Sequence, residues 1–192
     1  MALLWAEGFE SYGTSGSPAP SGVFGRRYPS YNTQSSTSYF SITTGRCGGY
    51  ALAFGYDTTC YFVTPKLPTT SDTLIIGFAV KFPTYASRDN FLNLYDDDTW
   101  GINLRQNYNE LSIYRGSTLL GTTSGADIHA DCWYFIELKI KCNSSSGTYE
   151  IRVGGATVGT GSSLNTKTGT HDYYNRVGLA AVYTTSSLFD DW

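Results

Sequence analysis

The 192-residue sequence has little charge, no long apolar run and a single methionine. Charged residues make up 15% of it, and 13 Lys and Arg against 16 Asp and Glu leave a net charge of −3. No Lys/Arg cluster is present, which argues against nucleic-acid binding. No apolar stretch approaches the ~20 residues that span a bilayer, and residues 1–7 lack the basic region and apolar length of a signal peptide. We therefore expect neither a nucleic-acid nor a membrane partner.

The sequence also lacks motifs typical of catalysis or zinc binding. The four cysteines, Cys47, Cys60, Cys132 and Cys142, follow neither a C-x-x-C nor a Cys/His zinc spacing. In a reducing compartment we expect them to be buried free thiols. No strand carries the alternating carboxylates of a glycosidase, and no Gly-x-Ser-x-Gly elbow is present. These absences predict that the chain is not an enzyme.

Tyrosine and glycine are abundant, with 16 and 21 residues respectively. Tyr, Thr and Val favour strands, whereas Gly and Ser favour turns. The stretch 133–153 shows period-two alternation on both sides of a polar turn, which predicts a β-hairpin with one buried face. In one register Leu138 faces Ile151 inside while Lys139 faces Glu150 outside, so apolar pairing and charge pairing agree.

Other segments with strand character are separated by turn residues, and no segment favours a helix. Further strands are expected at Tyr39–Ile42, Tyr50–Phe54, Cys60–Val63, Thr73–Phe82, Phe91–Tyr95, Trp100–Arg105, Glu110–Arg115, Thr118–Gly121, Ala156–Gly159, Val177–Tyr183 and Leu188–Trp192. About a dozen strands with little or no helix predict an all-β, two-layer antiparallel jelly-roll sandwich. We expect one domain over 1–192, with a long irregular excursion at about 13–37 and a polar loop at 162–175.

Several short motifs occur in an order found in one known group of domains. They are Glu7-Gly-Phe-Glu10, Gly45-Arg-Cys-Gly-Gly-Tyr-Ala-Leu52, Trp133-Tyr-Phe-Ile-Glu-Leu138, Tyr149-Glu-Ile-Arg-Val-Gly-Gly155 and Phe189-Asp-Asp191. The chain resembles the laminin-G-like, concanavalin A-like jelly-roll domains of structural proteins of tailed bacteriophages. The resemblance covers nearly the whole chain and implies the same fold.

The resemblance implies a non-enzymatic virion protein, most readily a capsid decoration or cement protein that binds the assembled head. Its partners would be other capsid or tail proteins, with many copies or a homo-oligomer on the particle. The contact residues expected from the Tyr- and Arg-containing N-terminal excursion are Tyr12, Arg26, Arg27, Tyr28 and Tyr31, because these residue types are enriched at interface hot spots. The alternative interpretation is a loop that packs on its own sandwich.

A second function class is a carbohydrate-binding module of a tail fibre or spike that recognises host surface glycans. Trp100, Tyr108 and Tyr114 are the candidate stacking residues for a pyranose ring. The alternative is that Trp100 lies in the core or at a strand boundary.

The acidic turn Asp96-Asp97-Asp98 is a candidate calcium site, because carboxylate oxygens are the ligands that calcium prefers. The alternative is a solvated loop tip that keeps a sheet edge soluble. A second candidate pair is Glu10 with Asp191, if the first and last strands are neighbours. Apart from this candidate calcium ion, we expect no cofactor.

Overall fold

The computed structural model describes residues 6, 8–9, 30–32, 40–54, 61–68, 70–83, 87–180 and 187–190. Of the expected contact and metal residues, Tyr12, Arg26, Arg27, Tyr28, Glu10 and Asp191 lie outside these ranges. Within them there is no α-helix, and none of the described residues belongs to a helix that could cross a membrane.

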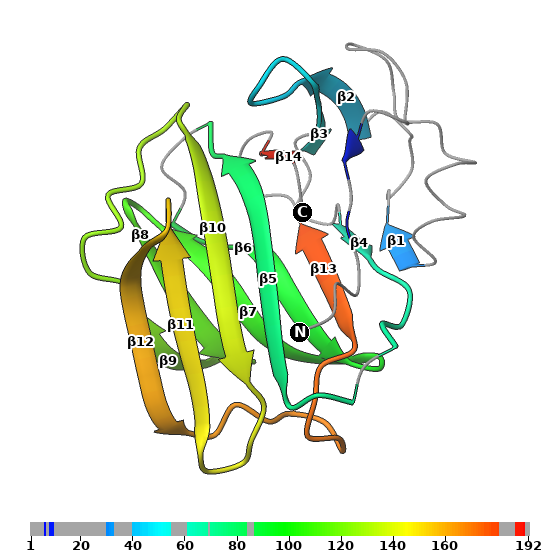
Figure 1. The fold of residues 1–192 in the computed structure, drawn as a ribbon, viewed down its shortest axis with the longest axis vertical. Coiled ribbons are helices and arrows are strands. Elements are labelled where there is room, and N and C mark those ends of the chain that lie inside the picture. Colours follow the sequence, from blue (N-terminus) through cyan, green and yellow to red (C-terminus); the bar gives the residue numbers. More distant parts are fainter. Residues whose placement is uncertain are drawn as a thin grey trace.

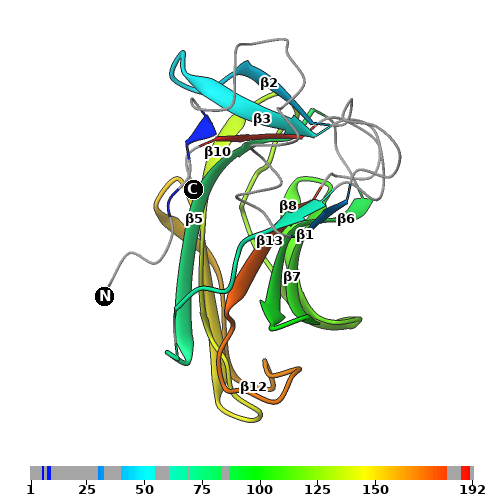
Figure 2. The same cartoon turned by 90° about the vertical axis from the view of Figure 1, so that its right-hand side faces the viewer.

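The described strands form two seven-stranded antiparallel sheets that lie face to face (Figures 1 and 2). Sheet A has the order β12 (Ala156–Leu164), β11 (Gly147–Val153), β10 (Trp133–Lys141), β5 (Thr73–Lys81), β14 (Leu188–Asp190), β3 (Tyr50–Phe54), β2 (Phe40–Thr44). Sheet B has the order β1 (Ser30–Asn32), β4 (Tyr61–Val63), β13 (Arg176–Ala180), β6 (Ser87–Asp96), β7 (Thr99–Asn107), β8 (Glu110–Arg115), β9 (Thr118–Thr122). The predicted all-β, two-layer jelly-roll sandwich is confirmed.

The last two strands enter the middle of the two sheets. Strand β13 pairs with β4 on one side and β6 on the other, and β14 lies between β3 and β5. Neither sheet can therefore be completed before the C-terminal part of the chain is in place.

The predicted hairpin register is confirmed. Leu138 pairs with Ile151 and Lys139 pairs with Glu150 in the antiparallel ladder of β10 and β11. The outer-face ion pair differs from the expectation, because the Glu150 Oε1 accepts a 2.8 Å hydrogen bond from Nε of Arg152 on its own strand. Residues two positions apart on a strand share a face, so this pairing leaves the register unchanged.

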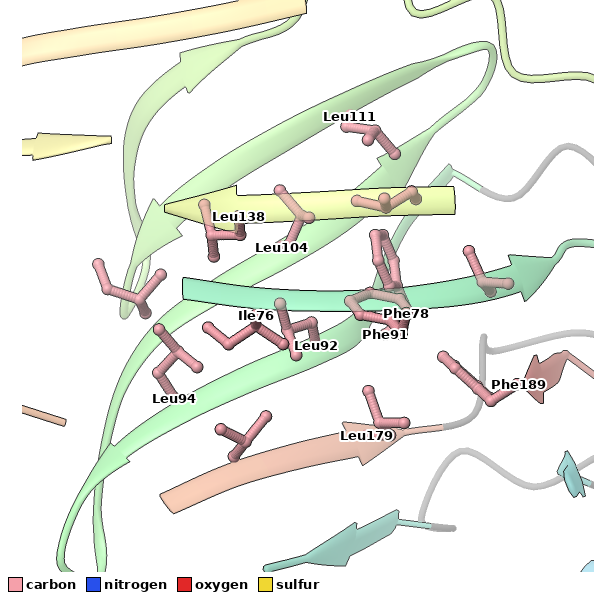
Figure 3. Close-up of a cluster of buried hydrophobic side chains, with 14 of the residues drawn as sticks. Ile76, Phe78, Phe91, Leu92, Leu94, Leu104, Leu111, Leu138, Leu179 and Phe189 are labelled. Atoms are coloured by element: carbon pink, nitrogen blue, oxygen red, sulfur yellow. The ribbon is translucent and has the colours of Figure 1, made fainter. Parts of the chain in front are cut away.

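The core is filled by alternate apolar side chains from the inner faces of both sheets. Figure 3 shows Phe78 of β5 beside Phe91 of β6, and their ring centroids are 6.1 Å apart. Phe54 of sheet A stacks on Phe62 of sheet B at 5.6 Å. All four side chains are fully buried. These ring contacts join the two sheets.

The irregular excursion expected at about 13–37 stays a prediction, because only Ser30–Asn32 of it lie among the described residues, where they form β1 and pair with β4. One other loop expectation is wrong. The predicted polar loop starting at residue 162 begins later, because β12 continues to Leu164 opposite Gly147 of β11. Backbone pairing with an existing strand outweighs the turn chemistry of the Gly- and Ser-rich sequence.

Of the three cysteines among the described residues, only Cys142 is a buried free thiol as expected, and Cys60 lies outside these residues. Cys47 and Cys132 are free but exposed. Cys47 lies in a turn and Cys132 directly before β10, where the ladder does not direct side chains toward the core.

Replacing Leu138 by Ala should lower the free energy of unfolding by about 2–5 kcal/mol, because it leaves a cavity in a fully buried position. Lys139→Ala, on the exposed side of the same strand, should change it by less than about 0.5 kcal/mol. Urea unfolding of both variants checks this. Equal effects would show that β10 does not divide the core from solvent in this register.

Candidate functional site

Sheet B carries a row of polar and aromatic side chains on the face turned away from sheet A. The inward positions of β6 and β7 include the fully buried Leu92 and Leu104, which pair in register. Because side chains alternate along a strand, their neighbours point outward. We define the outer face of sheet B by these residues: Asn93, Tyr95, Trp100, Asn103, Arg105, Ser112, Tyr114 and Arg176.

Trp100 is the most exposed aromatic side chain of this face, with 42% of its surface accessible. Its indole Nε1 donates a 3.0 Å hydrogen bond to Oδ1 of Asn93. The register between β6 and β7 shifts between Asn93 and Tyr95, so that Tyr95 pairs with Trp100. This β-bulge brings the indole over the neighbouring strand, where Asn93 fixes its orientation.

A second group surrounds Arg105 in the middle of the face. Its Nε donates a 2.6 Å hydrogen bond to Oδ1 of Asn103, and its Nη2 donates to the carbonyl of Gly116 at 3.3 Å. Asn103 Nδ2 donates to the same carbonyl at 3.1 Å. The guanidinium also lies over the ring of Tyr114, 4.0 Å from its centroid. These contacts hold a cation, an amide and an aromatic ring in one arrangement.

Tyr95 lies across β13. A side chain at Gly178 would come within 3.0 Å of its Cε2, so glycine at this position leaves room for the ring. Burial, together with a smaller effect of the nearby phenol of Tyr61, raises the pKa of Tyr95 to about 12. Tyr95 is therefore a phenol that remains protonated at neutral pH.

The acidic turn after β6 is organised by residues about 75 positions later in the chain. Asp96 is buried, and its Oδ1 lies 2.6 Å from Nδ1 of His171. Its Oδ2 accepts a 2.9 Å hydrogen bond from the backbone N–H of the same residue. Asp97 has a φ of 53°. Its backbone N–H donates to Asn175 Oδ1, and its carboxylate accepts from Asn175 Nδ2 and lies 2.9 Å from Nζ of Lys66.

The three aspartates of the predicted calcium site do not converge. Asp96 and Asp97 form a cluster with His171, whose candidate ligand atoms lie within 4.8 Å of one another, whereas Asp98 forms a 2.6 Å ion pair with Nη1 of Arg176. Each of the three carboxylates has a side-chain partner from a later segment of the chain: His171, Asn175 or Arg176. His171 was missed by sequence reasoning, since no local signal links it to the turn. Calcium binding stays a prediction.

The predicted sugar-binding residues are only partly brought together. Trp100 and Tyr114 share the outer face of sheet B. Tyr108 is 59% exposed but lies in the turn after β7, roughly 26 Å along the strand from Trp100. Of the predicted contact residues, Tyr31 lies in β1, in register with Phe62.

No family model and no curated protein sequence matches the chain. An alginate lyase of polysaccharide lyase family 14 from Aplysia kurodai is 13% identical, with a TM-score of 0.67 over 100% of this chain and 98% of that one. An endo-β-1,4-glucuronan lyase from Trichoderma reesei is 13% identical, with a TM-score of 0.62 over 85% and 89%. The catalytic domain of a glycoside hydrolase family 131 protein from Coprinopsis cinerea is 16% identical, with a TM-score of 0.53 over 98% and 91%. At these identities the likeness shows the shared jelly-roll fold alone.

The prediction that the chain is not an enzyme is contradicted by these comparisons, because the fold is that of polysaccharide lyases. The prediction depended on the absence of paired glycosidase carboxylates and of a Gly-x-Ser-x-Gly nucleophile elbow. A lyase cleaves by elimination and has no need of either. The role in a phage virion stays a prediction.

The buried phenol of Tyr95 should make stability depend on alkaline pH. Its pKa is raised in the folded protein, so its contribution is fully present below about 10 and is lost as the pH rises through about 12. Over that window the free energy of unfolding of the wild type should fall by on the order of 2 kcal/mol more than that of Tyr95→Phe. Denaturant unfolding at several pH values measures this. Tyr108→Phe, which removes an exposed hydroxyl, should follow the wild type, and identical slopes for all three proteins would contradict the assignment.

Proposed function

We propose that the chain binds polysaccharide on the outer face of sheet B. The observation that carries this proposal is the half-exposed Trp100, fixed by Asn93 beside the Arg105–Asn103–Tyr114 group. Two of the three solved structures of similar fold are lyases that act on glucuronan and alginate, and the third is a catalytic domain of a glycoside hydrolase family. These neighbours support polysaccharide as the class of ligand.

The chemistry of the face suits a sugar chain. A pyranose has apolar C–H surfaces that stack on an aromatic ring, and its hydroxyls form hydrogen bonds with amides and guanidinium groups. Asn93 and Asn103 are 6% and 0% exposed, so they do not meet the sugar themselves but hold Trp100 and Arg105 in place by hydrogen bonds. Side chains already fixed before binding lose little conformational entropy when a ligand arrives.

We prefer polysaccharide binding to the role in capsid decoration. The decoration role depends on the family resemblance and on contact residues of which only Tyr31 lies in the described part of the chain. Sugar binding depends on side chains whose contacts are described. A virion protein with this face would use it to attach to host surface glycans.

Trp100→Ala should weaken binding of polysaccharide fragments by about tenfold or more, because it removes the stacking surface. Ile75→Ala is the matched control, since Ile75 is 40% exposed but lies on β5 of the other sheet. Calorimetric titration with a panel of neutral and acidic oligosaccharides measures both variants. Equal losses in the two variants, or no binding by the wild type, would refute this surface as the site.

A second candidate function is polysaccharide lyase activity. In such an elimination a base removes the proton next to the sugar carboxylate, the C–O bond to the leaving sugar breaks, and the leaving oxygen takes up a proton. Tyr95 favours this candidate, because its phenol lies in register with Arg176 on the same face. We assign to Tyr95 the donation of that proton, and to Arg176 the neutralisation of the carboxylate.

If the chain is a lyase, Tyr95→Phe should reduce the rate of formation of unsaturated product by about 100-fold or more while oligosaccharide binding is retained. Tyr108→Phe, outside the face, should keep the wild-type rate. The ultraviolet absorbance of the unsaturated sugar follows the reaction with alginate and with β-1,4-glucuronan. Absence of product from the wild type with every acidic polysaccharide tested would leave binding as the function.

A further inference from the structure

Arg176 occupies an unusual position for a cation on this face. It is the first residue of β13 and pairs in register with Tyr95 of β6. Partners in an antiparallel ladder have their side chains on the same face, about 4.5–5.5 Å apart at Cβ. Its side chain is only 15% exposed, yet its Nη1 meets the exposed carboxylate of Asp98.

The hydrogen-bonding capacity of this guanidinium is largely unused. Its Nη1 donates to Oδ1 of Asp98 at 2.6 Å. Its Nε is buried and has no hydrogen-bond partner among the described residues. An arginine presents five N–H donors in a planar fork that matches the two oxygens of a carboxylate. A ligand carboxylate that approaches from the side of Asp98 would accept hydrogen bonds from both Nη groups, of which Asp98 engages only Nη1.

Asp98 is well suited to be displaced. Its side chain is 87% exposed at the tip of the β6–β7 turn, where a surface ion pair contributes little to stability. The turn itself does not depend on this contact, because Asp97 is held by Asn175 and Lys66 and Asp96 is held by His171. Asp98 can swing away from Arg176 while the strand ends keep their place.

We propose that Arg176 is a carboxylate-binding position within the sugar-binding face, which selects acidic, uronate-containing polysaccharides, and that Asp98 occupies it until the ligand arrives. This inference rests on the proposed polysaccharide binding. The sugar ring bound beside Tyr95 would present its carboxylate to the guanidinium, and the Asp98 carboxylate would leave to solvent. Asp98 thus competes with the ligand and lowers its affinity.

The test compares two ligands that differ at one carbon. A β-1,4-linked oligoglucuronate and a β-1,4-linked oligoglucose of the same length share a backbone and differ in carrying a carboxylate or a hydroxymethyl group. The wild type should bind the oligoglucuronate more tightly, and this preference should shrink as salt is added. Calorimetric titration gives both dissociation constants.

Two variants should change the preference in opposite directions. Arg176→Gln should weaken oligoglucuronate binding by about tenfold or more and oligoglucose binding much less, so that the preference for the acidic ligand is lost. Asp98→Asn should strengthen oligoglucuronate binding by about two- to fivefold, because the competing carboxylate is gone. Asp131→Asn is the control, since it removes a carboxylate of similar exposure, paired with Lys81 of sheet A, and should change neither affinity.

The outcomes separate this inference from the function on which it rests. Equal affinity of the wild type for the two ligands, or no gain for Asp98→Asn, would overturn the role of Arg176 while polysaccharide binding stands. Binding of neither ligand, nor of any other glycan, would overturn both. Should Arg176→Gln fail to fold, the gain expected for Asp98→Asn still decides the question.

Discussion

Packing of alternate apolar side chains of β6, β7 and β8 against sheet A is the constraint on which the rest of this molecule depends. Leu92, Leu104 and Ile113 are fully buried against sheet A, and they align across three neighbouring strands. A strand cannot turn these residues inward without turning the residues between them outward. The polar and aromatic character of the outer face of sheet B therefore follows from the packing of its inner face.

The outer face is unusual because several of its polar side chains are as inaccessible as the core. Asn103 and Ser112 are 0% and 1% exposed, although they point away from sheet A. Larger neighbours such as Arg105 and Tyr114 cover them, and each has a hydrogen-bond partner. Buried polar groups that are satisfied in this way restrict the conformations of the groups around them. The face is consequently a preformed surface rather than a set of mobile side chains.

Strand β13 forms one end of the outer face of sheet B. Its insertion between β4 and β6 places Arg176 next to Tyr95 and brings Gly178 beneath the Tyr95 ring. The loop that leads into β13 also supplies Asn175 and His171, which hold the acidic turn. One late segment of the chain thus builds both the cationic end of the face and the support of the turn beside it.

Local pattern alone determined most of the strands, the hairpin register between β10 and β11 and the two-layer fold, since alternation and charge pairing act between residues near one another in sequence. It also proposed Trp100, Tyr108 and Tyr114 as sugar-stacking residues, of which Trp100 and Tyr114 lie on the outer face of sheet B. Only the tertiary structure brought Arg176 to Asp98 and Asn175 to Asp97, across separations of 78 residues in both cases. These contacts depend on the position of β13 in the sheet, and strand order is set by the packing of the whole sandwich, which no local pattern records.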